Sequence, residues 1–305
     1  MRKIGIITLG AESDWAGMQL LEAARELANA TLLSPTSFSI RIDERPSVWA
    51  GIKPADSFDA FILRRFCSEG DVDSQFEVFE LLSHCGVLVI NSPASLSIAE
   101  SKAETAFLLR EAGLPVPRTV VTHDLATARA AVEEFGVAVL KPVYGSQGID
   151  IERIHAQEGT EVLGRFLDSH KVACIQEFIP HGNRDIRAFV VGDEVQAAVY
   201  RVAPNGEWKT NVSQGAICEP CTLTPEMSEI CVEAACVVGV DYTGVDIVEG
   251  PDGPVVLEVN GAPSWHGLPQ ESGWRLAHAI VRHVIDKAES QQPARLPRLK
   301  PRSSL

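Results

Sequence analysis

Short apolar runs alternate with amphipathic segments over the first hundred residues of the chain. The runs KIGIITL, DAFILRRF and VLVIN have the length and composition of buried strands. Between them, WAGMQLLEAARELANA and SQFEVFELLSHCG place apolar residues at helical spacing, and the second ends at Gly86. Alternating strands and helices indicate βαβ units around a parallel sheet, so we expect an open α/β domain over residues 1–98. The Gly-x-Gly-x-x-Gly motif of dinucleotide sites does not occur there.

The pattern changes near residue 99. IAESKAETAFLLREAG predicts a helix that ends at Gly113, and DLATARAAVEEFG predicts another, with Asp124 as its N-cap and Gly136 as its stop. From residue 137 onward, alternating positions and tight turns predict strands, so an α+β part follows the α/β domain. We expect subdomains over 99–178 and 179–290. Residues 291–305 contain the proline, serine and basic residues typical of a disordered tail.

The stretch LKPVYGSQGIDIERI places Lys141 four residues before the first glycine of a Gly-x-x-Gly turn. In a Walker loop the lysine follows the glycines and a helix begins at once. Here the lysine comes first and IDIERI alternates like a strand, which predicts a β-hairpin with YGSQG at its tip. Gly145 and Gly148 allow positive φ and close approach to phosphate oxygens, with Lys141 supplying charge. Taken alone, the segment fits an ordinary glycine-rich hairpin about equally well.

Residues 242–263 predict a second hairpin, which turns through GPDG. Alternation gives it an apolar face with Val245, Ile247, Leu257 and Val259, and a polar face with Asp246, Glu258 and Asn260. The turn brings Asp246 opposite Glu258. Facing carboxylates destabilise a sheet unless they are neutralised, and Mg²⁺ shared with substrate phosphates would neutralise them. The alternative is a solvated surface pair, which the apolar flanks disfavour.

Composition narrows the classes of function. The net charge of −14 disfavours a general nucleic-acid binder, because binding to phosphates requires clustered Lys and Arg. No apolar run reaches the length of about 20 residues that spans a membrane, and MRKIGIITLG reads as a strand rather than a signal peptide. The seven scattered cysteines favour a reducing cytoplasm, and we interpret CEPC as incidental thiols rather than a zinc site.

The order of several motifs resembles the ATP-grasp ligases. These are Lys102, Lys141 with GSQG, and then QEFI, DIRAFVVGDEV, YRV, TNVSQGA, GVDI and EVN. The chain is most similar to the RimK-like glutamate ligases, a family with relatives that add glutamate to tetrahydromethanopterin. The resemblance is dense from about residue 88 to 286 and implies an ATP-grasp fold that follows the N-terminal open α/β domain.

The resemblance also implies roles for particular residues. Contacts to ATP are implied for Lys102, Lys141, Gly145, Ser146, Gln147, Gly148, Glu177, Phe178, Ile179, Asp185, Lys209, Thr210 and Asn211. The metal ligands would be Asp246, Glu258 and Asn260. Arg187 and Arg201 would face the γ-phosphate and the acyl group, with Arg201 the better candidate for stabilising the tetrahedral intermediate. Ion pairing with nearby carboxylates is the alternative for both arginines.

The implied reaction joins a carboxylate to an amine at the expense of ATP. The cofactors would be ATP and two Mg²⁺ or Mn²⁺ ions. The partners would be a small-molecule or peptide carboxylate and an amino-acid amine, in a homodimer or homotetramer. Phosphoryl transfer needs positioning and charge neutralisation, so no protein nucleophile is expected. The alternatives are a D-amino-acid or lysine-biosynthesis ligase, or a regulatory nucleotide-binding protein without turnover.

Two segments depart from the family pattern. Ser101 stands where relatives have Asp before the first lysine, and Ser264, Trp265 and His266 follow the proline after the metal asparagine. The second departure leaves the amine partner open, because Trp265 either stacks on a planar substrate or seals a buried interface. Arg64 ends a strand of the first domain and either binds an anionic substrate or is solvated.

Overall fold

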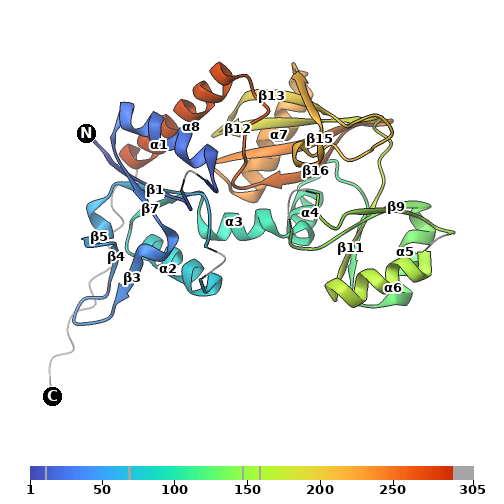
Figure 1. The fold of residues 1–305 in the computed structure, drawn as a ribbon, viewed down its shortest axis with the longest axis horizontal. Helices are drawn as coiled ribbons and strands as arrows, with labels where there is room; N and C mark the ends of the chain where they lie inside the picture. Colours follow the sequence, from blue (N-terminus) through green and yellow to red (C-terminus); the bar gives the residue numbers. More distant parts are fainter. Residues whose placement is uncertain (11, 68–69, 146–147, 158, 291–305) are drawn as a thin grey trace. The chain divides into compact units, whose positions relative to one another are not determined.

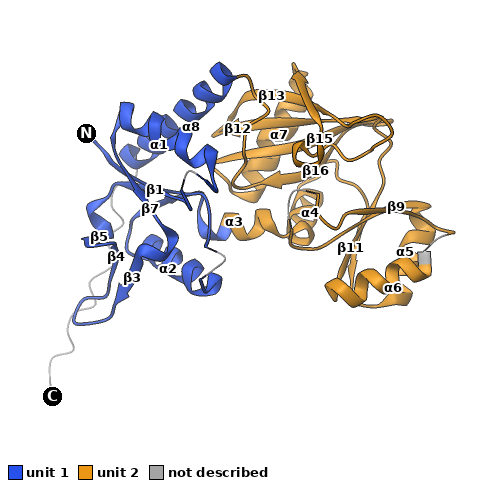
Figure 2. Ribbon diagram, viewed as in Figure 1, with its two compact units in different colours: residues 1–94, 270–305 blue, residues 95–269 orange. Residues whose placement is uncertain are grey.

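The computed structural model describes residues 1–290 except 11, 68–69, 146–147 and 158. The chain forms two compact units, shown in Figures 1 and 2. The first comprises residues 1–94 and 270–305, and the second residues 95–269. Helix α8 (Gln270–Ser290) thus groups with the N-terminal unit, whereas the sequence suggested that it ends the C-terminal subdomain. The tail predicted at 291–305 lies outside the described residues.

The first unit contains the expected open parallel sheet, in the order β2-β1-β6-β7. Its strands are β1 (Lys3–Ile7), β2 (Asn29–Leu33), β6 (Ala60–Leu63) and β7 (Leu88–Ile90). Helices α1 (Trp15–Leu27) and α8 pack on each other, and α2 (Val72–His84) packs against β7. The parallel pairing confirms the α/β interpretation.

One predicted boundary in this unit is wrong. The helix expected to reach residue 30 ends at Leu27, and β2 begins at Asn29 because its backbone pairs with β1. Pairing with β1 therefore outweighs the local helix propensity of the alanine-rich segment.

A small antiparallel sheet follows β2 in the chain, and the sequence pattern did not predict it. It consists of β3 (Phe38–Arg41), β4 (Ser47–Ala50) and β5 (Lys53–Pro54), with short 3-10 helices at Pro35–Ser37 and Ala55–Ser57.

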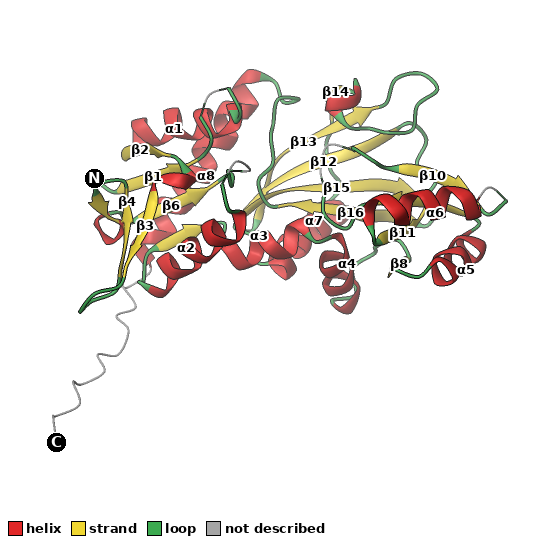
Figure 3. Cartoon of the chain, turned by 60° about the horizontal axis from the view of Figure 1, so that its bottom comes forward, coloured by secondary structure: helices red, strands yellow, loops and turns green. Residues whose placement is uncertain are grey.

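The second unit begins with an antiparallel sheet in the order β10-β9-β11-β8. Its strands are β8 (Thr119–Thr122), β9 (Val137–Lys141), β10 (Glu152–His155) and β11 (Ala173–Glu177). Figure 3 shows α5 (Leu125–Phe135) and α6 (Gly159–His170) beside this sheet, and both pack on its strands. Pairing of β9 with β10 confirms the first hairpin, although β10 starts at Glu152 rather than at residue 149.

The larger sheet of this unit has the order β14-β13-β12-β15-β16 and is antiparallel throughout. Its strands are β12 (Arg184–Val191), β13 (Glu194–Val202), β14 (Ile217–Pro220), β15 (Tyr242–Gly250) and β16 (Gly253–Asn260). A 3-10 turn, Val212–Gln214, lies between β13 and β14. Helices α4 (Lys102–Glu111) and α7 (Pro225–Val238) pack on one face around Ile186, Val245 and Val259. The opposite face is free to carry polar side chains.

The single helix expected over residues 98–112 is instead two helices. α3 (Pro93–Glu100) ends one residue before Ser101, which is the N-cap of α4 and accepts a hydrogen bond from the Glu104 amide at 3.2 Å. Serine and aspartate cap helices about equally well, so this departure from the family preserves the local geometry before Lys102. The Asp124 cap and the Gly136 stop of α5 are both confirmed.

A bulge corrects one residue of the second predicted hairpin. Asp246 pairs with Glu258 as expected, but Ile247 pairs with Val256, so Leu257 is the extra residue on β16. A bulge turns the following side chains over relative to strict alternation. Val256 therefore joins the core beneath the sheet, whereas Leu257 lines a cavity with Glu258. The prediction that Leu257 faces the core is wrong for this reason.

Candidate active site

Oppositely charged residues lie in a row across three strands of the larger sheet. Arg187 on β12 is the register partner of Asp246 on β15, which in turn pairs with Glu258 on β16. Two residues before Arg187 on β12, Asp185 lies opposite Arg201 of β13. Alternation along each strand places these side chains on the face opposite the α7 core. The sheet register therefore brings together five of the residues that the sequence singled out.

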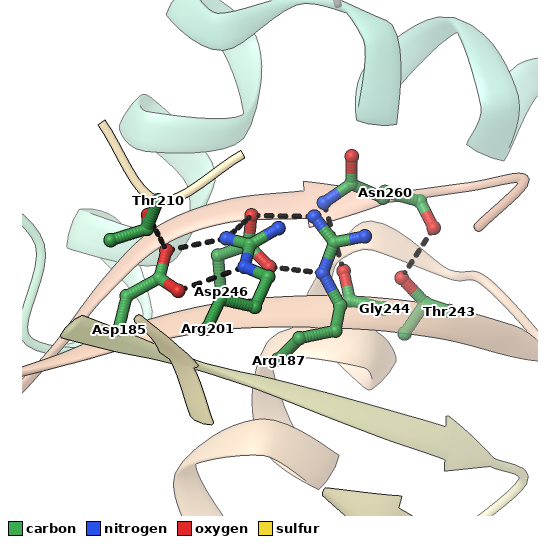
Figure 4. Close-up of polar contacts among 8 residues, drawn as sticks. All are labelled: Asp185, Arg187, Arg201, Thr210, Thr243, Gly244, Asp246 and Asn260. Atoms are coloured by element: carbon green, nitrogen blue, oxygen red, sulfur yellow. Dashed lines mark hydrogen bonds and ion pairs between the residues drawn. The ribbon is translucent and has the colours of Figure 1, made fainter. Parts of the chain in front are cut away.

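These side chains form one connected network, drawn in Figure 4. The guanidinium of Arg187 donates to both carboxylate oxygens of Asp246, with Nη2 to Oδ2 at 2.7 Å. Arg201 donates to both oxygens of Asp185, with Nε to Oδ1 at 2.8 Å, and its Nη2 lies 2.9 Å from Oδ2 of Asp246. The Thr210 hydroxyl donates to Asp185 at 2.6 Å. The ion-pair alternative therefore describes both arginines in this structure.

Burial makes this network sensitive to charge. Asp246 is 5% exposed, Arg201 7% and Arg187 14%. Burial alone would raise the pKa of Asp246, but Arg187 and Arg201 outweigh it and hold that pKa below its usual value. Burial likewise opposes the charged form of Arg201, yet Asp246 and Asp185 raise its pKa overall. Asp246 and Arg201 are therefore both charged at neutral pH.

Asn260 lies two residues beyond Glu258 on β16, opposite Gly244. The side-chain amide nitrogen of Asn260 donates to the Gly244 carbonyl at 3.1 Å, and the backbone carbonyl of Asn260 accepts from the Thr243 hydroxyl at 2.8 Å. The side-chain oxygen points away from these contacts in Figure 4, so it remains available as an oxygen ligand. Gly244 also makes room for Arg187, because a Cβ there would lie 2.9 Å from Cδ of that arginine.

Both predicted lysines line a cavity next to the charged row. Lys102 is the first residue of α4, and its Nζ donates to the Gly145 carbonyl at 2.7 Å and lies 4.0 Å from Glu258. Lys141 ends β9 and donates to the Gln176 side chain at 2.6 Å. Burial lowers the pKa of Lys141, and Glu258 opposes that effect. The rest of the lining is largely apolar: Ala99, Thr105, Ala106, Leu109, Val116, Val256 and Leu257.

The predicted glycine loop meets the segment between β13 and β14. Gly148 has a φ of +72°, and a Cβ on it would lie 2.5 Å from the Asn211 side-chain oxygen. Asn211 and Gly148, which the resemblance names separately as contacts to ATP, thus lie together, and a side chain at position 148 would displace Asn211. Gly145 has a φ of +153°. Ser146 and Gln147, for which the resemblance implies contacts to ATP, lie outside the described residues.

Several residues for which the resemblance implies contacts to ATP make other contacts in the structure. Arg118 donates to both carboxylate oxygens of Glu177 at 2.9 Å. The Arg153 guanidinium lies 5.1 Å from the ring centre of Phe178 and 5.4 Å from that of Trp208. Ile179 packs against Gly250 of β15, and Lys209 lies 5.9 Å over Trp208. These residues stay candidates for the nucleotide site.

Sequence reasoning missed several residues of this region. Gln176 precedes the QEFI glutamate and is the partner of Lys141, and Leu257 lines the cavity because of the bulge. Gly244 shares its strand with Asp246 and was passed over, although a glycine beside a buried charge signals a close approach. The bulge itself cannot be recognised from the alternation of apolar and polar residues.

Two further predictions have outcomes in the structure. Trp265 is 1% exposed, so it belongs to the buried interior rather than to a surface that stacks on substrate. Among the described residues, no group of three His, Cys, Asp or Glu side chains is arranged to hold a metal, and all seven cysteines are free thiols. The proposed metal site has two carboxylates and one amide, so it rests on Asp246, Glu258 and Asn260 alone.

The two-sheet unit with a charged row and two lysines defines an ATP-grasp protein. The chain belongs to the RimK-like ATP-grasp family, whose domain description matches residues 99–284. This confirms the family inferred from the sequence motifs.

Among curated proteins, the chain is 35% identical to the tetrahydromethanopterin:alpha-L-glutamate ligase of Methanosarcina acetivorans, over 93% of this chain and 99% of that protein. It is 32% identical to a probable alpha-L-glutamate ligase of Thioalkalivibrio sulfidiphilus, over 94% and 96%. Similar solved structures include the ATP-grasp ligase PsnB with minimal precursor, Mg and ADP, at a TM-score of 0.71 and 23% identity, covering 94% of this chain and 98% of PsnB. The expected fold is thereby confirmed.

Proposed function

We propose that the protein is a cytoplasmic, ATP- and Mg²⁺-dependent ligase that joins a carboxylate to the amine of glutamate or a similar amino acid. The observation that carries this proposal is the row of Arg187, Asp246 and Glu258 beside the cavity of Lys102 and Lys141. The row offers cations for phosphate oxygens and carboxylates for a hard metal ion. The protein's membership of a family with ligase relatives supports the same conclusion.

The residues present fit Mg²⁺ on their donor chemistry. Asp246, Glu258 and Asn260 present two carboxylates and an amide oxygen, which are the ligand types that Mg²⁺ accepts while it keeps other positions for phosphate oxygens or water. When bound, Mg²⁺ would neutralise the charge that develops on the transferred phosphoryl group. We further propose two ions, because two carboxylates and the phosphates of one nucleotide can be shared between them.

The charge balance of this face also favours a nucleotide with its metal. Four cations, Lys102, Lys141, Arg187 and Arg201, stand against three carboxylates, Asp185, Asp246 and Glu258, which leaves an excess of about one positive charge. An excess of one charge attracts a polyphosphate but does not neutralise it. Metal ions would supply the remainder.

The side chains would then act mainly by position. Lys102 and Lys141 would hold phosphate oxygens, while Arg187 and Arg201 would orient the carboxylate that attacks the γ-phosphorus. That attack releases ADP and gives an acyl phosphate. The amine nitrogen then attacks the acyl carbon, and phosphate leaves as the amide bond forms. No described side chain is required as a nucleophile.

The identity of both substrates is a finer proposal. A relative is named for tetrahydromethanopterin and glutamate, and we propose glutamate as the amine and a small-molecule or peptide-terminal carboxylate as the acceptor. The buried position of Trp265 removes it as a stacking surface for a pterin, so ring recognition would need other residues. We also propose a dimer or tetramer, and a central and a C-terminal subdomain within residues 95–269.

The proposal is tested by formation of ADP and phosphate with purified protein. Products should accumulate only when a carboxylate and an amine are both present, and hydroxylamine in place of the amine should trap the acyl phosphate as a hydroxamate. Glu258→Gln should abolish turnover, whereas Glu249→Gln, an exposed carboxylate of the same hairpin, should not. Phosphate release at full rate without any amine would contradict the mechanism. ATP binding without turnover across a broad substrate panel would favour a regulatory role.

A further inference from the structure

The carboxyl edge of the parallel sheet in the first unit has the geometry of a ligand site. The strand order β2-β1-β6-β7 means that the chain runs from β1 to one neighbour and later returns to the other side of β1. Open α/β sheets bind ligands outside the carboxyl ends of their strands where the order reverses in this way. Here that point lies between the ends of β1 and β6, whose last residues, Ile7 and Leu63, are register partners.

Two arginines, Arg64 and Arg65, follow β6 directly at this point, and their side chains differ in burial and in hydrogen-bond partners. Arg64 is fully buried and bound to Asp14, with Nη2 to Oδ1 at 3.0 Å and Nε to Oδ2 at 3.2 Å. The Thr8 hydroxyl donates to the same carboxylate at 2.7 Å. Burial alone would raise the pKa of Asp14, but Arg64 lowers it below its usual value. The charge of Arg64 is therefore neutralised within the fold, so neither alternative from the sequence, binding of an anionic substrate or a solvated charge, describes Arg64 in this structure.

The Nε atom of Arg65 is buried and has no hydrogen-bond partner among the described residues, whereas the side chain as a whole is partly exposed. A buried donor without an acceptor loses its hydrogen bond to water and destabilises the fold, so such groups call for an explanation. A ligand with two coplanar oxygens would satisfy both this Nε and the adjacent amino group of the guanidinium fork.

The segment around Arg65 is held on both sides. The backbone amide of Arg64 donates to the Ile7 carbonyl at 3.0 Å, which extends the sheet by one residue. Two residues beyond Arg65, Cys67 accepts from and donates to the side chain of buried Gln75, at 2.9 and 2.7 Å. The ring of Phe66 stacks on Phe76 at 6.0 Å. A backbone held in place, with one guanidinium donor left without an acceptor among the described residues, is a preorganised binding element.

We propose that Arg65 binds a carboxylate group of the ligase's own substrate at the carboxyl edge of this sheet. The inference rests on the proposed function for the substrate class, but its geometry stands on the first unit alone. Arg65 is a binding residue that sets substrate affinity and takes no part in phosphoryl transfer. Its contribution should therefore be the same in the ground state and the transition state, and its loss should raise KM more than it lowers kcat.

The test compares Arg65→Gln with Arg45→Gln, which removes an exposed arginine from the same unit. Calorimetry on the full chain with L-glutamate, succinate and inorganic phosphate at constant ionic strength gives a readout that does not need turnover. We expect Arg65→Gln to weaken binding of at least one carboxylate about tenfold or more, Arg65→Lys to restore part of it, and Arg45→Gln to bind like wild type. In turnover assays the KM for the carboxylate-bearing substrate should rise in parallel, with the KM for ATP unchanged.

Three outcomes would overturn the assignment. Carboxylate binding could be equal in Arg65→Gln and Arg45→Gln, or absent from the wild type, and both results would mean that Arg65 is only a solvated charge. Binding of phosphate alone would show a different oxyanion. Failure of the proposed function has a separate signature, because it would abolish substrate-dependent ADP formation in the wild type while leaving Arg65-dependent carboxylate binding intact.

Discussion

Removal of the two proposed metal carboxylates should lower stability by unequal amounts, although both should be required for turnover. In Asp246→Ala, Arg187 loses its carboxylate partner at 14% exposure, while Arg201 keeps Asp185. Removing one partner from a buried ion pair costs about 3–5 kcal/mol, because the remaining charge stays buried and unpaired. Domains of roughly 150–250 residues lose about 2–4 °C in Tm per kcal/mol. The expected loss in the Tm of the second unit is therefore about 6–20 °C.

Glu258→Ala provides the matched comparison. Its side chain is 32% exposed, and its nearest cation, Lys102, lies 4.0 Å away. A single ion pair at this distance, with its carboxylate still in contact with solvent, contributes at most about 1 kcal/mol, so the Tm should fall by no more than about 4 °C. Scanning calorimetry without ligand gives both values, and ADP formation with saturating substrates gives the activity. Equal Tm losses in the two variants, or an active Glu258→Ala protein, would refute the reasoning from burial and charge.

Two other substitutions test single contacts. Gly244→Ala places a Cβ 2.9 Å from Cδ of Arg187, so we expect about 1–3 kcal/mol of lost stability by urea unfolding and a lower kcat. Gly164→Ala, at an open helical position, should instead be neutral or stabilising, and unchanged kcat in Gly244→Ala would contradict the close approach. The lowered pKa of Asp14 stabilises the fold above the unfolded value near 4, and this contribution is lost as pH falls through the folded pKa. Asp14→Asn should therefore be less stable at neutral pH and show a flatter loss of unfolding free energy below about pH 4, whereas parallel curves would exclude this linkage.

Sequence patterns predicted the elements that are decided locally. The caps of α5 at Asp124 and Gly136 are confirmed, because a cap depends only on neighbouring residues. Alternation over residues 242–263 correctly placed Asp246 opposite Glu258, since the GPDG turn sets the register. The predicted end of α1 was wrong because the residues from Asn29 onward pair with β1. Pairing with a strand that is distant in sequence cannot be recognised from the local pattern.

For the candidate site, the sequence by itself determined that two carboxylates and an amide of one hairpin would share a face of the sheet. Period-two alternation and hairpin register are local properties, so Asp246, Glu258 and Asn260 could be grouped before any coordinates, whereas Asp185, Arg187 and Arg201 entered only through the family resemblance. Only the tertiary structure decided which of them pair, which are buried and which residues complete the cavity. The bulge that exposes Leu257, the partners that separate Arg64 from Arg65 and the space that Gly244 leaves for Arg187 all depend on segments packed from elsewhere in the chain. Burial then sets the energetic weight of each charge, because desolvation depends on everything that surrounds a group rather than on its neighbours in sequence.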